Sequence, residues 1–468
     1  MPWFGRHGDS ECTWIDRHFG IDTRALATVR ILLGCLVVID LGLRAPHLRT
    51  FYTDAGVLPR TVLRELYPVL AHLSLHTVSG GFGVVALSFV FAGILAGSLS
   101  IGYRSRLCAG LLVVFYGSLF ARNPLVLHGG DGLLLTGLLL SVFLPIGARW
   151  GIEASRDATS NQRITNLATV TILVQLVLLY AVNAIFKLQS DVWLEGNAIQ
   201  HVLQLEQFSV RLGPTLAAQD GLTSLLTWAW IGLLALGPFL VVTVGRVRLL
   251  LILGFALFHI GMLATMQLGL FPLVVLTLLL LYIPECAWDA VESQLPRVAI
   301  GPENPHNDQR ASSEAHAGTK RIVSGMLVIV LVGSLLWPAG AVGAPVPGPA
   351  EAEYPYTLFA PQPTQASEWL VLSATTTDGE AIHPIAGWER DGGFNPSQDT
   401  SPGVLWEQYS SEIRFGSETT HNAFGEYLCR SADAHVEQVE SVRADRVSEP
   451  TAVIDGDRTT RVLVEQQC

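Results

Sequence analysis

The sequence has few charged residues, and one basic residue type is almost missing. Only 15% of its 468 residues are charged, whereas a soluble protein of ordinary composition has about 25%. It has 27 arginines but only two lysines, Lys187 and Lys320. Half of the residues are hydrophobic and the mean hydropathy is +0.41. This composition excludes a disordered chain, a collagen-like chain and a small disulfide scaffold, and it indicates a membrane protein.

The charges that are present divide the chain into two parts. Residues 343–468 contain 20 acidic residues and 7 arginines, whereas residues 1–342 contain 20 acidic and 22 basic residues. The first part is therefore nearly neutral and suited to lipid, and the second is an acidic, water-facing tail. Neither part has the basic surface that a nucleic-acid backbone requires. We expect the lipid bilayer, and no nucleic acid, as a partner.

Cysteine is sparse as well. The six cysteines include no CxxC pair and no Cys/His spacing typical of structural zinc, so we predict no metal site. Cys429 and Cys468 both lie in the tail, where an oxidising environment would allow a disulfide. A pair of cysteines in one small domain can also stay reduced, and both alternatives are open at this point.

The apolar segments predict an all-α polytopic membrane helical bundle of about eight or nine spans. No apolar segment precedes the first span, so we expect no cleavable signal peptide. With the N-terminus inside, the inner loops carry 14 Lys and Arg residues against 7 on the outside. This bias predicts a cell-membrane protein with a cytoplasmic N-terminus and an extracytoplasmic C-terminus. The stretches that approach the length of a bilayer are 25–43, 82–101, 107–121, 131–147, 164–187, 222–244, 248–267, 269–284 and 322–343.

The tail predicts a small water-facing α+β domain. A β-rich run with a turn at Asp378-Gly379 is typical of a hairpin, a helical segment with a glycine break follows, and two alternating segments predict strands. The predicted organisation is an inner segment 1–24, a transmembrane domain 25–285, a flexible inner loop 286–321, a last span 322–343 and the α+β domain 344–468.

The densest polar signal is YAVNAIFKLQSDVWLEGNAIQHVLQLEQF, residues 180–208. Lys187 ends the fifth predicted span, and Trp193 and Glu195 follow it. One interpretation is that Lys187 extends from the membrane edge into water. The other is that an amine in apolar surroundings is available in its neutral form as a base or nucleophile. Arginine cannot serve this purpose because it is never neutral.

Two further polar positions lie within or beside apolar segments. His259 either hydrogen-bonds a neighbouring helix, or it relays protons or orients a polar substrate head group. In ARNPLVLHGGDGLLL, Asp131 is suited to capping the fourth span. With His128, it could instead line a polar pocket that faces Lys187. Arg30 and Asp40 of the first span lie about 15 Å apart along the helix, so each is expected to find a partner elsewhere.

The order of these motifs resembles a known family. RILLG, FYTDAGVLPR, YRSRL, RNPLVLHGGD, Tyr-x6-Lys followed by Trp-Leu-Glu-Gly, and Phe-His-x10-Leu-Phe-Pro are similar to the horizontally transferred transmembrane (HTTM) domain family. Vitamin K-dependent γ-glutamyl carboxylase belongs to this family. The resemblance covers roughly residues 14–285, and the tail fragments YTLFAPQP, TDGEAI and EYLCR are similar to prokaryotic members.

The resemblance implies roles for individual residues. Lys187 matches the lysine that deprotonates a reduced quinone in the carboxylase, and Phe258, His259 and Gly269 match a Phe-His motif and the turn after it. The implied catalytic residues are Lys187, His259 and Asp131. The implied quinone-binding residues are Tyr180, Trp193, Glu195, His128 and Phe271.

The sequence also departs from the carboxylase pattern. A second lysine just before the catalytic one is Phe186 here, and an asparagine three residues after the histidine is Met262. An Asn-His pair near the third and fourth spans is replaced by the His-Gly-Gly-Asp pattern of His128 and Asp131. A tail of about 120 residues leaves no room for the large lumenal domain that binds a propeptide, which puts recognition of a protein substrate in question.

Two functions of different classes follow. The resemblance implies an enzyme that uses a reduced quinone of the menaquinol or vitamin K type, O2 and CO2. Such an enzyme couples quinol epoxidation to deprotonation of a carbon acid, in a peptide or protein substrate at the extracytoplasmic face. The alternative is a non-catalytic accessory or scaffold for secreted-peptide maturation or immunity, in which Lys187 and His259 are structural contacts between helices. A transporter is a third hypothesis, but there is no inverted repeat and there are few midplane charges.

Overall fold

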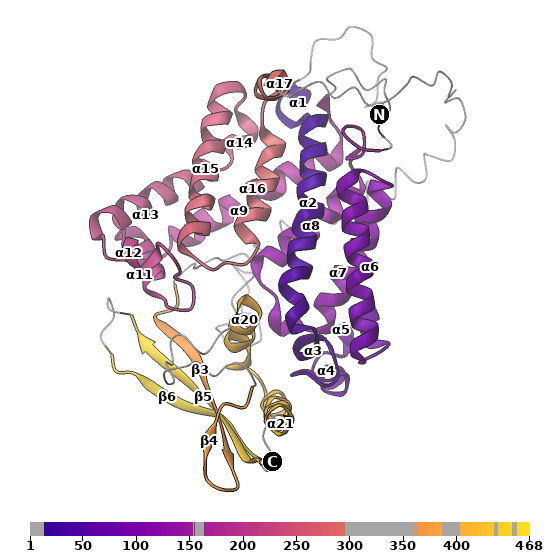
Figure 1. Ribbon diagram of the computed structural model, residues 1–468. Helices are drawn as coiled ribbons and strands as arrows, with labels where there is room; N and C mark the ends of the chain where they lie inside the picture. Colours follow the sequence, from indigo (N-terminus) through magenta and orange to yellow (C-terminus); the bar gives the residue numbers. More distant parts are fainter. Residues whose placement is uncertain are drawn as a thin grey trace.

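The computed structural model has a helical body and a C-terminal region built on a small sheet (Figure 1). It describes residues 14–152, 154, 163–294, 359, 363–385, 403–434, 439–451 and 456–468. The helices of the body are α1 (Trp14–Phe19), α2 (Thr23–Arg44), α3 (Leu48–Tyr52), α4 (Arg60–Leu66), α5 (Pro68–Leu73), α6 (Phe82–Ile101), α7 (Ser105–Arg122), α8 (Gly129–Val142), α9 (Leu167–Lys187), α10 (Asp191–Leu194), α11 (Ala198–Gln204), α12 (Gly213–Ala217), α13 (Asp220–Ala235), α14 (Phe239–Val242), α15 (Gly245–Thr265), α16 (Phe271–Leu279) and α17 (Glu285–Gln294).

Five helical stretches within the described residues are long and apolar enough to cross a membrane. They are Thr23–Tyr52, Phe82–Ile101, Ser105–Arg122, Leu167–Lys187 and Gly245–Thr265. A sixth is counted if Phe271–Tyr282 and Glu285–Gln294, which are bent by 103°, form one span. The chain is thus a polytopic helical membrane protein, but the predicted count of eight or nine spans is not confirmed.

The difference in span count has local causes. The predicted span 131–147 is the 14-residue helix α8, too short to meet the length of about 20 residues. The predicted span 222–244 is divided into α13 and α14 around Pro238, which lacks the N–H of a continuing helix. The predicted span 322–343 lies outside the described residues.

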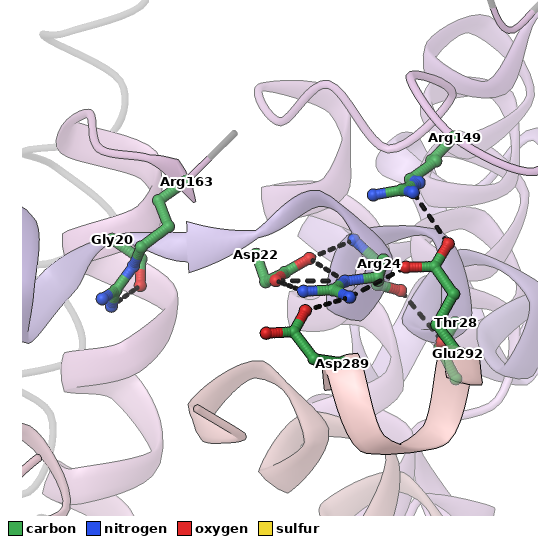
Figure 2. Close-up of polar contacts among 8 residues, drawn as sticks. All are labelled: Gly20, Asp22, Arg24, Thr28, Arg149, Arg163, Asp289 and Glu292. Carbon is green, nitrogen blue, oxygen red and sulfur yellow. Dashed lines mark hydrogen bonds and ion pairs between the residues drawn. The ribbon is translucent and has the colours of Figure 1, made fainter. Parts of the chain in front are cut away.

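A buried arginine joins the start of α2 to α17. The side chain of Arg24 is fully buried, and its guanidinium donates to the carboxylate of Asp22 at 2.8 Å. It also donates to two carboxylates of α17, Asp289 at 2.8 Å and Glu292 at 2.9 Å (Figure 2). Arg149 donates to the other oxygen of Glu292 at 2.8 Å. These ion pairs explain why residues 286–294, predicted as part of a flexible loop, form a helix. The rest of that predicted loop, and the first thirteen residues of the predicted inner segment, lie outside the described residues.

The C-terminal region has the predicted mixture of helices and strands. Its antiparallel sheet has the order β4-β3-β5-β6, and the β3–β4 turn contains Gly379 at φ +81°, a conformation that favours glycine. Cys429 and Cys468 form a disulfide, which settles that open alternative. The elements are β3 (Ala366–Thr376), β4 (Ala381–Ile382), α20 (Val404–Ile413), α21 (Glu418–Asp433), β5 (Val439–Pro450) and β6 (Thr459–Gln467), and a two-stranded pair β1 (Ile21–Asp22) and β2 (Arg163–Ile164) lies in the body.

The C-terminal region packs directly against the helical body. Phe51 of α3 lies edge-on to Trp406 of α20, with ring centroids 5.1 Å apart. One cluster of buried hydrophobic residues continues from the spans into the C-terminal sheet. The two parts therefore share a core, and a residue of the C-terminal region can contribute to a site in the helical body.

Candidate functional site

The candidate site is a cavity between α9, α13, α15 and the start of α16. Its volume is about 380 Å³, and both Lys187 and His259 line it. Tyr180, Trp193 and Phe271 line it too. Five of the eight residues singled out in the sequence therefore surround one space.

Lys187 is the last residue of α9 and is 1% exposed. Its Nζ lies 3.4 Å from the amide oxygen of Asn183, one helical turn earlier, and 4.2 Å from the centroid of the Trp193 ring. The side chain therefore points into the cavity wall and does not extend into water. A short helix following α9 turns the chain back so that Trp193 covers the amine.

The turn that carries Trp193 depends on a glycine. Gly196, at φ +82°, is the second residue after α10, and a Cβ there would approach the side chains of Ser224 and Trp228 to 2.6 and 2.8 Å. Only glycine fits this conformation and this close approach. The preceding Glu195 is exposed and does not line the cavity. Glu195 thus lies outside the cavity that Tyr180, Trp193 and Phe271 line.

His259 of α15 lines the cavity and is hydrogen-bonded within its own helix. Its Nδ1 lies 2.7 Å from the backbone carbonyl of Phe255 in the same helix. Because a carbonyl only accepts, Nδ1 carries the hydrogen and the neutral ring has an acceptor lone pair on Nε2. Nε2 hydrogen-bonds no residue in the described part of the chain. The bond of His259 lies within its own helix, so the interpretation as a contact to a neighbouring helix is not supported.

Aromatic rings hold the imidazole in place. Their centroids lie 5.7 Å (Trp230), 6.0 Å (Phe271) and 6.2 Å (Tyr180) from that of His259. Tyr180 also stacks on Phe255 at 4.0 Å. The hydroxyl of Tyr180 is buried and has no hydrogen-bond partner among the described residues. Tyr180 as a residue lines the largely apolar cavity.

Asp131 and His128 lie outside this lining. Asp131 is 2% exposed, and its carboxylate accepts from Arg44 at 2.6 Å. Arg44 also pairs with Asp40 at 2.8 Å and donates to Tyr52 at 2.6 Å. The cavity and this ion cluster are separate, so Asp131 does not face Lys187.

Asp131 does contribute to the start of α8. Its carboxylate accepts the backbone N–H of His128 at 3.2 Å, which agrees with the capping interpretation. The imidazole Nε2 of His128 lies 3.6 Å from the same carboxylate.

Asp40 finds its partners in Arg44 of its own helix and Tyr116 of α7. Arg30 donates to the backbone carbonyl of Ser100 near the end of α6 and to that of Arg149 in the segment after α8.

Of the cavity residues that the sequence did not single out, three bear on the site. Asn183 lies four residues before Lys187, and this spacing on a helix could have indicated the contact. Trp230 belongs to an apolar segment in which nothing distinguishes it from other lipid-facing aromatics. Phe359 comes from the C-terminal region, far along the chain, and local sequence gives no signal for its position.

The wall of the cavity between α13 and α15 carries exposed apolar residues. Leu257 lines the cavity and is 69% exposed, and its neighbours Leu253 and Ile260 on α15 are 55% and 53% exposed. Leu225 on α13 is 65% exposed. Exposed apolar side chains on long apolar helices are typical of a lipid-facing surface. The cavity therefore lies beside the face that contacts lipid.

The comparisons with known proteins identify the family. A family model described as the HTTM domain matches residues 19–288, which is more than half of the chain. No curated protein and no solved structure matches the chain. In the described residues, no group of three or more His, Cys, Asp or Glu side chains could hold a metal ion. On the family match, together with its apolar helices, this chain is an integral membrane protein that belongs to the HTTM domain family.

Proposed function

We propose that the chain is a quinol-dependent membrane oxygenase or carboxylase in which the amine of Lys187 acts as a base on a lipophilic acid. One observation carries the proposal: Lys187 and His259 line the same largely apolar cavity. Deprotonation of a hydrophobic hydroxyl compound requires a base that takes the proton and a hydrogen-bond acceptor that positions the hydroxyl group. Lys187 and His259 can supply these two groups in one apolar cavity. The family relation to γ-carboxylase supports the same chemistry at the level of the family.

The lining fits a reduced quinone. A volume of about 380 Å³ falls in the range of about 300–1,000 Å³ that is common for small-molecule sites, which are mostly apolar with a few polar groups. Nε2 of His259 can accept a hydrogen bond from a quinol hydroxyl. The rings of Trp230 and Phe271 can pack against an aromatic head group.

Lys187 would accept the proton of a quinol hydroxyl. The oxygen of Asn183 orients the amine by accepting one of its N–H groups. Once the amine is protonated, the face of Trp193 at 4.2 Å stabilises the ammonium, since the ring face attracts a cation. Asn183 and Trp193 thus hold the amine of Lys187 in one place, whether it is neutral or protonated.

The surroundings of the amine exclude water. Lys187 and His259 are each 1% exposed, and most other lining residues are apolar or aromatic. A quinol oxidised by O2 supplies the strong base that such a reaction uses to deprotonate a carbon acid, with CO2 as an acceptor. Water would protonate that base, so a dry cavity is a requirement of the chemistry.

The proposed route of entry is from lipid. The exposed apolar residues of α13 and α15 beside the cavity allow a polyprenyl tail to remain among lipid chains while the head group reaches Lys187. We propose further that the protein lies in the cell membrane with its C-terminal region outside, where a peptide or protein substrate would meet it. The inner position of the N-terminus rests on the distribution of Lys and Arg in the loops, and the outer position of the C-terminal region requires an odd number of spans.

Purified protein in lipid nanodiscs, supplied with menaquinol and O2, tests the proposal. We expect Lys187→Ala to lower the rate of quinol oxidation by about 10²- to 10⁴-fold, the range for loss of a general base. A Lys320→Ala variant changes the chain's other lysine and serves as the control. Equal rates for wild type and Lys187→Ala would contradict the proposal and leave an accessory role.

A further inference from the structure

One residue of the C-terminal region takes part in the membrane cavity. The side chain of Phe359 lines it together with Lys187, whereas the other lining residues fall between Leu179 and Phe271. Phe359 is separated from Phe271 by almost ninety positions in the sequence. The cavity wall is therefore incomplete without the C-terminal region.

Phe359 also binds the residue that covers the amine. Its backbone carbonyl accepts the indole N–H of Trp193 at 3.0 Å. The face of the same indole lies 4.2 Å from Nζ of Lys187. Because one edge of the ring is held by this hydrogen bond, the ring cannot turn away from the amine without breaking the bond. Phe359, Trp193 and Lys187 thus form a continuous series of contacts.

Phe359 is itself held by the loop after α11. Its ring lies edge-on to Phe208, with centroids 5.1 Å apart. It also packs against a small apolar cluster of the same part of the body, which consists of Val202, Leu203, Ala217 and Met266. A ring fixed on two sides gives its backbone carbonyl a defined position for Trp193.

Polar bonds tie the same segment to the C-terminal sheet. His201 of α11, 3% exposed, donates from Nε2 to the carbonyl of Thr364 at 2.8 Å, and its Nδ1 accepts from the hydroxyl of Thr451 at 3.2 Å. The backbone N–H of Glu206 donates to the hydroxyl of Ser367 at 3.1 Å. These contacts involve residues that precede β3, begin β3 and follow β5. The sheet is therefore attached to the segment on which Phe359 packs.

We propose that Phe359 is a positioning residue for Lys187: the C-terminal region, through Phe359 and the Trp193 indole, sets the place of the amine in the cavity. The consequence for catalysis rests on the proposed function. The positioning itself does not, because it concerns only the contacts of Phe359, Trp193 and Lys187.

The scarcity of lysine makes a direct test possible. Full-length protein labelled with ¹³C at lysine Cε gives only two lysine signals, from Lys187 and Lys320, and a Lys320→Arg variant assigns them. In nanodiscs, the indole face should displace the Lys187 signal upfield from its ordinary position. We expect Phe359→Ala to move this signal toward the ordinary position, and Phe359→Leu, which keeps an apolar side chain, to retain most of the displacement.

Two other variants complete the test. Phe415→Ala makes the same change between α20 and α21, away from the cavity, and should leave both signals unchanged. Phe208→Ala removes the ring on which Phe359 packs and should move the Lys187 signal in the same direction as Phe359→Ala. It also decides the question if Phe359→Ala is not recovered folded. An unchanged Lys187 signal in every folded variant of Phe359 and Phe208 would overturn the proposal.

Kinetics separate this proposal from the proposed function. If the protein oxidises menaquinol, Phe359→Ala should lower kcat by about tenfold to a hundredfold with a smaller change in KM, as expected for a misplaced reacting group. A displaced Lys187 signal without any quinol oxidation by the wild type would support the positioning role and contradict the proposed function. Quinol oxidation that is unaffected by Phe359→Ala would contradict the positioning role alone.

Discussion

The amine of Lys187 lies over the face of the indole ring of Trp193, with Nζ 4.2 Å from the ring centroid, and both side chains are buried. In water this contact would contribute little, whereas between desolvated groups it is worth about 2 kcal/mol. The contact stabilises only the protonated amine. The ring of Trp193 therefore stabilises Lys187 once the amine has accepted a proton.

Replacement of Trp193 tests this relationship. We predict that Trp193→Leu lowers quinol oxidation by about 10- to 30-fold, because loss of about 2 kcal/mol of stabilisation corresponds to this factor. Trp193→Phe keeps an aromatic face and should lose less. Trp14→Leu, a change at an exposed tryptophan of α1, is the control. Similar rates for Trp193→Leu and the control would show that the ring has no part in the reaction.

A second prediction concerns His259. His259→Phe keeps a ring of similar size but removes the acceptor nitrogen Nε2 of a residue that lines the cavity. Loss of one hydrogen bond of about 1 kcal/mol should weaken binding of the reduced form, menaquinol, about fivefold, measured in the absence of O2 by quenching of tryptophan fluorescence in nanodiscs. His72→Phe, at an exposed histidine of α5, should bind as the wild type does. Unchanged affinity in His259→Phe would remove His259 from the binding site.

Replacement of Asp131 is predicted to lower the stability of the folded protein. It is one of two carboxylates that pair with the buried Arg44, and removal of one partner from a buried ion pair costs about 3–5 kcal/mol. We therefore expect Asp131→Asn to lower the thermal midpoint of unfolding in detergent, while the folded fraction keeps its rate of quinol oxidation. A normal midpoint combined with a lost reaction would instead return Asp131 to the chemistry.

A pH effect is predicted at the loop after α3. Burial alone would raise the pKa of the Asp54 carboxyl, but hydrogen bonds from the side chain and backbone of Arg60 and the charges of Arg60 and Arg122 lower it below the ordinary value. The folded-state pKa thus lies below the unfolded value of about 3.9. The stabilisation is complete above that unfolded value and is lost as pH falls through the folded value.

Asp54→Asn should accordingly be less stable than the wild type at neutral pH, and the difference should shrink below about pH 4. Thermal midpoints recorded across this range in detergent measure it. Asp378→Asn, which changes an exposed carboxylate of the β3–β4 turn, is the matched control. A constant difference between Asp54→Asn and the wild type at all pH values would contradict the assignment of the effect to this carboxylate.

Much of the helical body is predictable because long apolar runs end at clear signals. The helix α6 has the predicted bounds 82–101, and α9 ends at Lys187 as expected. Composition fails where a segment is apolar but the helix stops early, as at Pro238. It also fails at α17, a polar segment whose helix is held by ion pairs with Arg24 and Arg149 and by the buried Trp288.

The candidate site was predictable where its residues share a helix or a short turn. The resemblance brought together Lys187, His259 and Trp193, and all three line the same cavity. The sequence could not show that Asp131 pairs with Arg44, because the spacing of residues along a chain does not reveal which helices pack together. The position of Phe359 depends on how the C-terminal sheet lies on α11, which no local pattern encodes.

The most direct test of the account is the rate of menaquinol oxidation by Lys187→Ala with and without small primary amines. The shortened side chain leaves space beside Trp193, and an added amine could take the proton in place of Nζ. The account predicts a loss of about 10²-fold or more that methylamine or ethylamine partly restores in proportion to concentration. A variant that oxidises quinol as fast as the wild type would contradict the claim that Lys187 is the base.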